Sequence, residues 1–250
     1  MSSSDITLWI FSRATREESV EQRHAEVMER MTGFGAPLGF AGLELPPAPE
    51  FGGRVIAPYR VKPSIRGLKC EGNYLYRGGH FLYEDNAKFD DSLRYGFKVT
   101  NKAIDYRAVL HEQFPKVIEA FRGYRAFCSY GSYLSAYQDG SPDGQPIIDA
   151  SGYFVQNNPV YNRLREDKSI DIDGRNNIYT LRPAQYWDAE LCRRALGYGP
   201  EGVMARLQGQ VPRVERLMDG VYTVLNDDPG MSYKDFVAMN EQIKPVLGLV

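Results

Sequence analysis

The C-terminal part of the chain, residues 211–250, carries the pattern that most constrains the fold. Two short apolar runs, 214–218 and 221–225, flank the pair Asp219-Gly220. An Asp-Gly pair between two such runs is typical of a two-residue type I′ turn, which joins antiparallel strands. The sequence therefore predicts a β-hairpin at this position.

A helix is expected directly after the hairpin. Ser232 can cap its first turn, and Asp235, three residues later, can return a hydrogen bond to the cap residue. Apolar residues then recur at helical spacing: Phe236, Met239, Ile243, Val246 and Leu247. Because neither the hairpin nor this helix holds an ionisable group placed for chemistry, we expect both to serve as scaffold.

Strand and helix patterns alternate through the rest of the chain. The β-branched and aromatic run 6–11 predicts a strand, and the apolar spacing over 20–31 predicts a helix that Thr15 can cap. Two short strands are expected within 73–83, and a helix over 185–196. We therefore predict an α+β fold, in which helices pack on a mixed or antiparallel sheet.

The expected domain organisation is one domain over residues 1–250, with two subdomains as the alternative. A chain of 250 residues can bury a sizeable core in either arrangement. Segment 138–146, QDGSPDGQP, is the best candidate boundary, because two Asp-Gly pairs and a Ser-Pro cannot continue a helix, and a loop tip is the equal alternative.

Composition argues against several functional classes. The net charge of −2 leaves no basic footprint for nucleic acid, and no apolar run is long enough to span a membrane. The N-terminus lacks the features of a signal peptide, so a cytoplasmic location is expected. Cys70, Cys128 and Cys192 are odd in number and far apart, which disfavours a disulfide framework or a zinc site. No cofactor or metal is expected.

Four carboxylates form an acidic cluster just before a strand-like run at 93–99: Glu84, Asp85, Asp90 and Asp91. Paired carboxylates can hold a metal ion or act as general acid and base. Solvated charges on a loop are far commoner, and the spacing matches no metal motif, so a loop surface is the expected structure.

Tyrosine is the most over-represented functional residue, with 17 of 250 positions. Tyr130, Tyr133 and Tyr137 recur at helical spacing shortly before Asp139. Tyrosine offers a large contact area with a polar tip at small entropic cost, and recognition surfaces are enriched in it. The alternative, that these rings are half-buried structural residues, is left open.

An enzyme is the second hypothesis. His80 follows a Gly-Gly pair that can form an anion-binding nest, and Asp85 or Asp90 could act beside it in a small enzyme such as a hydrolase. The same Gly-Gly pair is also a hairpin signal. The sequence contains no phosphate loop, no dinucleotide fingerprint and no nucleophile elbow. We therefore expect no catalytic activity.

Two C-terminal segments resemble a known family: PAQYWDAELCRRALGYGPEGVMARL, from Pro183, and RVERLMDGVYTVLNDDPGMSYKDFVAMNEQIKPVLGL, from Arg213. They are similar to the immunity protein 52 family of bacterial polymorphic toxin systems, and more narrowly to immunity proteins against type VI secretion nuclease toxins. The resemblance spans about residues 180–249, with 5–31 in keeping, and is one of general pattern. It implies an α+β protein that binds a restriction-endonuclease-type toxin in the cytoplasm without enzymatic activity.

The resemblance brings no family site residues, so the expected contacts come from chemistry. A nuclease must offer a positive surface to its substrate, and acidic groups beside aromatic rings can compete for that surface. The partner would be inhibited by occlusion of its active site or by a block to its assembly, and the chain could act as a monomer or a homodimer. The expected partner-binding residues are Glu84, Asp85, Asp90, Asp91, Tyr130, Tyr133, Tyr137 and Asp139.

Overall fold

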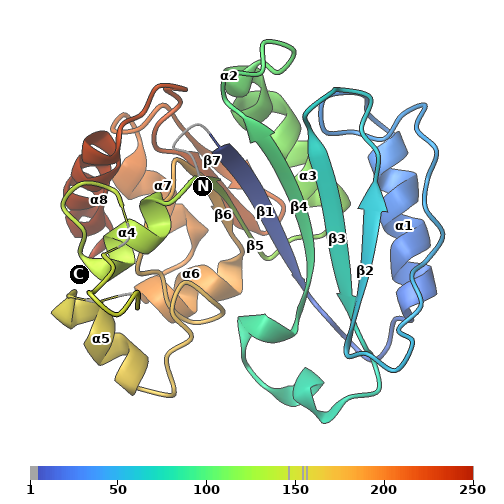
Figure 1. The fold of residues 1–250 in the computed structure, drawn as a ribbon, viewed down its shortest axis with the longest axis horizontal. Coiled ribbons are helices and arrows are strands. Elements are labelled where there is room, and N and C mark those ends of the chain that lie inside the picture. The colour runs from blue at the N-terminus through green and yellow to red at the C-terminus, as the bar shows by residue number, and fades with distance from the viewer. Residues whose placement is uncertain (1–4, 146, 154, 156, 250) are drawn as a thin grey trace.

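A single large sheet forms the centre of the protein. The computed structural model describes residues 5–145, 147–153, 155 and 157–249. Within them, eight strands lie in the order β2-β3-β4-β1-β5-β6-β8-β7, and every pairing is antiparallel (Figure 1). The strands are β1 Asp5–Arg13, β2 Ile56–Val61, β3 Lys69–Leu75, β4 Asp90–Lys98, β5 Arg125–Tyr130, β6 Ala184–Trp187, β7 Arg213–Leu217 and β8 Gly220–Val224. The predicted α+β class is confirmed, with an antiparallel sheet.

Helices cover the sheet in two groups. In Figure 1, α1 and α3 lie behind strands β2, β3 and β4, whereas α4 to α8 gather around the other end of the sheet. The α-helices are α1 Val20–Thr32, α2 Tyr106–Ala108, α3 Phe114–Ala120, α4 Tyr133–Asp139, α5 Pro159–Glu166, α6 Ala189–Leu196, α7 Pro200–Leu207 and α8 Tyr233–Leu247. No helix in these described ranges is long and apolar enough to cross a membrane.

The central strand β1 distinguishes the two faces of the sheet. Its side chains alternate, because successive residues of a strand point to opposite sides. Ile6, Leu8 and Ile10 are buried on the side that α1 and α3 cover. Trp9 and Phe11 point to the opposite face and remain partly exposed. The two faces therefore differ in solvent access near the middle of the sheet.

The predicted C-terminal hairpin forms, but its turn lies one residue earlier than expected. Leu217 pairs with Gly220, so the two loop residues are Met218 and Asp219, and Met218 takes a positive φ of 47°. Gly220 instead begins β8. A Cβ atom at Gly220 would overlap the backbone carbonyl oxygen of Trp187, so close packing against β6 requires the glycine.

The cap predicted for the last helix is confirmed. The Asp235 amide donates to Ser232 Oγ at 3.2 Å, and the Ser232 amide donates to an Asp235 carboxylate oxygen at 3.0 Å. The first helix begins later than expected, since Ser19, not Thr15, caps it through a capping box with Gln22. The apolar spacing located the helix correctly, but the sequence offers two possible N-cap residues, Thr15 and Ser19, and the structure uses the second.

Two other elements differ from expectation for tertiary reasons. Within 73–83 only the first strand forms, and His80–Tyr83 is a short 3₁₀ helix, η1. The helix expected from Gln185 is preceded by strand β6, which ends where Asp188 caps α6. All four residues of β6 are buried. A strand buried on both faces lacks the alternation that marks a strand in sequence.

The sheet continues past the candidate boundary at 138–146. Strand β5 precedes this segment and β6 follows it, yet the two pair with each other, as Ala126 does with Tyr186. The sheet itself is therefore not divided there. The expectation of one domain, with two subdomains as the alternative, therefore stays a prediction.

We expect Gly220→Ala to lower the free energy of unfolding by about 2–4 kcal/mol, because the new methyl group must displace the backbone of β6. Gly96→Ala is the matched control, since a Cβ atom at Gly96 in strand β4 meets nothing within 4 Å. The control should change stability by less than about 1 kcal/mol. Urea unfolding of both variants measures the difference, and equal losses would contradict the packing explanation.

Candidate functional site

The best candidate surface is the connection between β3 and β4, residues 76–89, which we call the 76–89 loop. In Figure 1 it extends beyond the lower end of the sheet. It contains η1 and a second 3₁₀ turn, η2 Ala87–Phe89. The loop includes His80, Glu84 and Asp85, and it leads directly into Asp90 and Asp91 of β4. Most of the acidic and histidine candidates from the sequence therefore meet here.

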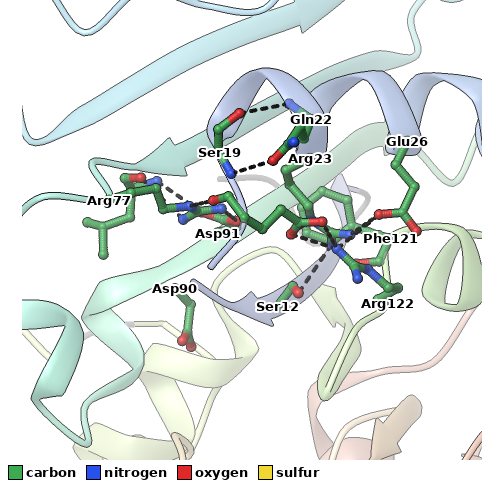
Figure 2. A network of polar contacts seen from close by, with 12 residues as sticks. Ser12, Ser19, Gln22, Arg23, Glu26, Arg77, Asp90, Asp91, Phe121 and Arg122 are labelled. Carbon is green, nitrogen blue, oxygen red and sulfur yellow. Dashed lines mark hydrogen bonds and ion pairs between the residues drawn. The ribbon is translucent and has the colours of Figure 1, made fainter. Parts of the chain in front are cut away.

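Asp91 fastens the start of the loop to the end of β3. Its side chain is 1% exposed and receives both arms of the Arg77 guanidinium, at 2.8 and 2.6 Å (Figure 2). The backbone amide of Leu75 donates to the same carboxylate at 2.9 Å. A two-armed guanidinium–carboxylate pair is both strong and directional. Asp91 is therefore an internal anchor, not the exposed loop charge that we expected.

A second set of charges lies beside this anchor, on α1 and at Glu18 just before it, whose backbone carbonyl accepts a hydrogen bond from Arg77 at 3.3 Å. Arg23 is 1% exposed and donates to the backbone carbonyl of Phe121, just after α3. Glu26 lies 3.7 Å from Arg23 and 3.0 Å from Arg122 (Figure 2). Glu18 also pairs with Arg122, at 2.5 Å. The network ties α1 to the connection between α3 and β5, next to the Asp91 anchor.

Asp90 fastens the end of the loop from the opposite face of the sheet, because adjacent strand residues point in opposite directions. Its side chain is 0% exposed, and it accepts hydrogen bonds from Arg175 and from the Tyr124 hydroxyl, both at 2.5 Å. Burial raises the pKa of Asp90 to about 6, while Arg175 and Tyr124 act in the other direction. Arg175 also donates to the Glu84 carbonyl at 3.0 Å. Asp90 is thus a second internal anchor.

Between its anchors the loop presents polar and aromatic groups to solvent. Asp85 pairs with Arg194 at 3.0 Å, and this hydrogen bonding lowers the pKa of Asp85. Glu84 is exposed. The Tyr83 ring is 74% exposed, and the Arg16 guanidinium lies over it at 4.3 Å. The exposed part of the expected acidic cluster therefore consists of Glu84 and Asp85.

The expected tyrosine surface lies mostly inside the protein. Tyr130 and Tyr133 are buried and stack at 5.9 Å, and their hydroxyls donate to backbone carbonyls of the segment before α8. Tyr137 is half-buried and Asp139 is buried. The alternative weighed from the sequence, structural rings, describes these tyrosines. Tyr133 and Tyr137 lie on α4 and contact Phe236 of α8, whereas Tyr130 is the last residue of β5, so the spacing is helical only from Tyr133 onward.

Arg16 carried no signal of a surface role in the sequence, and Tyr83, although it is one of the tyrosines beside polar residues, was not among the expected partner contacts. Tyr83 stood at the end of an apolar run that predicted a strand, and a strand would have buried one of its faces. Arg16 stood in the stretch that was expected to begin the first helix. A Gly-Gly pair followed by an acidic run was the available signal for an exposed loop.

Among the described residues, His80 is not paired with either carboxylate that the enzyme hypothesis places beside it. Its ring is exposed and 5.7 Å from the Phe81 ring. No hydrogen bond in those ranges joins it to Asp85 or Asp90, whose carboxylates bond Arg194 and Arg175 instead. Over the same residues, no group of three or more His, Cys, Asp and Glu side chains could hold a metal ion.

Comparison with known proteins gives a distant structural likeness. No protein-family model matches the chain, and no curated protein sequence matches it. Among solved structures, the fold is similar to that of the Pseudomonas aeruginosa T6SS protein PA0821, with a TM-score of 0.45 and 12% sequence identity. The match covers 97% of this chain and 72% of that chain. A likeness this distant carries no argument about function.

We expect Arg77→Met to lower the free energy of unfolding by about 3–5 kcal/mol, because it leaves the Asp91 carboxylate buried and unpaired. Arg60→Met is the matched control, since the Arg60 side chain is 83% exposed and its Nε lies 3.3 Å from Glu71. Loss of that surface pair should cost less than about 1 kcal/mol. Urea denaturation gives both values, and similar losses would refute an anchoring role for Arg77.

The raised pKa of Asp90 predicts a specific pH dependence. Because the folded pKa of about 6 exceeds the unfolded value of about 3.9, the fold binds this proton more tightly than the unfolded chain does. The resulting stability is complete below about pH 4 and is lost as pH rises through about 6. Asp90→Asn should remove this contribution, so the wild type should lose stability relative to the variant between pH 4 and 6.5. Thermal unfolding across that range tests it, and parallel curves would exclude the raised pKa.

Proposed function

We propose that the protein is an immunity protein, which binds and neutralises a nuclease-type toxin of a type VI secretion system in the cytoplasm. In this proposal the chain acts by binding, not by catalysis, and either occludes the toxin's active site or blocks its assembly. The sequence resemblance of residues 180–249 to the immunity protein 52 family supports the class of function. More narrowly, these residues resemble TsiT, the immunity partner of the nuclease toxin TseT.

The exposure of Tyr83 on an anchored loop is the observation that carries the choice of surface. Tyrosine is enriched among residues that dominate binding energy. The Tyr83 ring is 74% exposed, and Glu84 and Asp85 follow it directly. Carboxylates at this position complement the positive surface that a nuclease offers to nucleic acid, and such complementarity accelerates association.

The anchors at both ends of the 76–89 loop suit it to binding. A loop that is already ordered loses little conformational entropy when a partner docks. Asp90 and Asp91 hold the two ends, and the Ala87 amide adds a hydrogen bond of 2.8 Å to Asp171. The proposal therefore assigns contact to Tyr83, Glu84 and Asp85, and assigns support to the two buried carboxylates.

The protein encoded immediately upstream of this gene provides the test of function. The proposal expects it to be a large secreted protein with a nuclease domain. Coexpression of this chain should restore the growth of cells that produce that domain, and the two should purify as a stoichiometric complex. An upstream product without a toxic nuclease domain, or a toxic one that neither binds this chain nor is neutralised by it, would overturn the proposal.

Variants of the 76–89 loop test the surface. We expect Tyr83→Ala to weaken toxin binding by about 10–30-fold, as the loss of a central aromatic contact does. Glu84→Lys should slow association and flatten its salt dependence, because it removes electrostatic steering. Surface plasmon resonance at several salt concentrations gives the equilibrium and rate constants.

The matched controls are Tyr153→Ala, at a tyrosine that is 72% exposed outside the loop, and Glu241→Lys, at an exposed glutamate of α8. Both should bind within about twofold of wild type, since surface substitutions away from an interface change little. If the controls weaken binding as much as the loop variants do, the interface lies elsewhere. Growth protection by the wild type would still support the function in that case.

A further inference from the structure

A small cavity, partly open to solvent, lies where the sheet meets the segment 173–182. Strands β5 and β6, which are neighbours in the sheet (Figure 1), form one wall. Segment 173–182 forms the other wall. The side chains that matter most for its chemistry are Arg125, Asp173, Asn177, Thr180, Arg182 and Gln185.

The cavity is lined by hydrogen-bond donors that have no partner. Arg125 Nε, Arg182 Nη1, Gln185 Nε2 and Thr180 Oγ1 are buried, and within the described part of the chain no acceptor reaches any of them. The residues are 9%, 3%, 2% and 2% exposed, respectively. Asn177 Oδ1 is an unpartnered acceptor on the described wall, and the Thr180 hydroxyl can accept as well as donate. Buried polar groups are nearly always hydrogen-bonded, so four idle donors at one cavity point to a missing acceptor.

The charges on the cavity wall do not balance. Asp173 is the lining carboxylate, and its oxygens are already used. One oxygen accepts from the backbone amides of Tyr179 and Thr180, at 2.7 and 2.8 Å, and the other accepts from Arg182 at 3.3 Å. Two guanidiniums face one carboxylate, which leaves one positive charge on the wall at neutral pH.

The excess charge belongs to Arg125. Among the described residues, no carboxylate oxygen lies within 4.0 Å of its guanidinium, which instead lies over the Phe11 ring at 4.3 Å. The Asp90 carboxylate interacts with Arg125 at longer range, but it is bonded to Arg175 and Tyr124. Asp90 and Arg175 cancel each other's charge, so including both leaves the same excess of one positive charge around the cavity. A buried charge without a counter-ion is strongly unfavourable.

We propose that this cavity binds one monatomic, monovalent anion of the size of chloride, held between the arginine side chains of Arg125 and Arg182. The cavity has a volume of about 20 Å³. The centre of a water-sized body needs about 10–15 Å³ on this measure, so there is room for one such ion and none for a phosphate or a nucleotide. A single anion would accept from the idle donors and offset the excess charge. A water molecule would accept hydrogen bonds from these donors but would not offset the charge.

The bound anion would connect segment 173–182 to the middle of the sheet. Arg175 belongs to this segment and holds both Asp90 and the Glu84 carbonyl. By holding this segment in place, the anion would also stabilise the position of Arg175 and, through it, the end of the 76–89 loop. This inference does not depend on the proposed function, because it concerns a ligand of the free chain.

Thermal unfolding of the full chain in different sodium salts tests the site. At constant ionic strength, replacing gluconate by chloride should raise Tm along a saturating curve, because a ligand of the native state stabilises it by mass action. At ten times Kd the rise should be about 3–6 °C for a chain of this size. Bromide should act as chloride does, and sulfate should not. Equal Tm values in chloride and gluconate would overturn the proposal.

Arg125→Gln should abolish the chloride-dependent rise in Tm. Arg94→Gln is the matched control, since Arg94 lies on the same face of the sheet, over the Trp9 ring at 5.1 Å, and does not line the cavity. The control should keep the full rise, and a loss in both variants would contradict the assignment.

If Arg125→Gln does not fold, crystals of the wild type grown in sodium bromide decide the question. An anomalous peak within hydrogen-bond distance of Arg125 Nε and Arg182 Nη1 would support the site. An ordered water there without anomalous signal would show that the cavity is hydrated and holds no anion.

Discussion

The burial of two consecutive carboxylates at the start of β4 is the constraint on which the candidate surface depends. Asp90 and Asp91 point to opposite faces of the sheet, because neighbouring strand residues alternate. Each carboxylate therefore needs its own cation. Arg77 supplies one from the loop itself, and Arg175 supplies the other from a distant segment. The two pairs fix both the path of the loop and the side of the sheet to which it returns.

The parts of the fold that could be predicted from the sequence are those that local chemistry decides. Ser232 and Asp235 are three residues apart, so their capping box follows from the order of residues alone. The hairpin was predictable for the same reason, although its turn was placed one residue late. Gly220 is required by its contact with Trp187, which is distant in sequence, so the local sequence pattern does not indicate it.

The anchoring of the candidate site could not be predicted, because its partners are far apart in sequence. Asp90 meets Arg175 and Tyr124, and nothing near any of the three residues indicates the others. An acidic run of this kind is usually a solvated loop, and that rule holds here for Glu84 and Asp85. It is wrong for Asp90 and Asp91, since β4 begins earlier than the apolar pattern indicated and carries them into the sheet.

The buried carboxylates that anchor the 76–89 loop and the exposed side chains of that loop have different roles. The exposed Tyr83 ring contributes contact area without holding the fold, and the Arg16 guanidinium over it belongs to the same surface. The Asp90 carboxylate contributes no contact area, yet the position of the Glu84 backbone depends on the arginine that binds it. A substitution at Tyr83 should therefore act on affinity alone. One at Arg175 should act on affinity through stability and loop geometry together, so measuring both quantities separates the surface from its support.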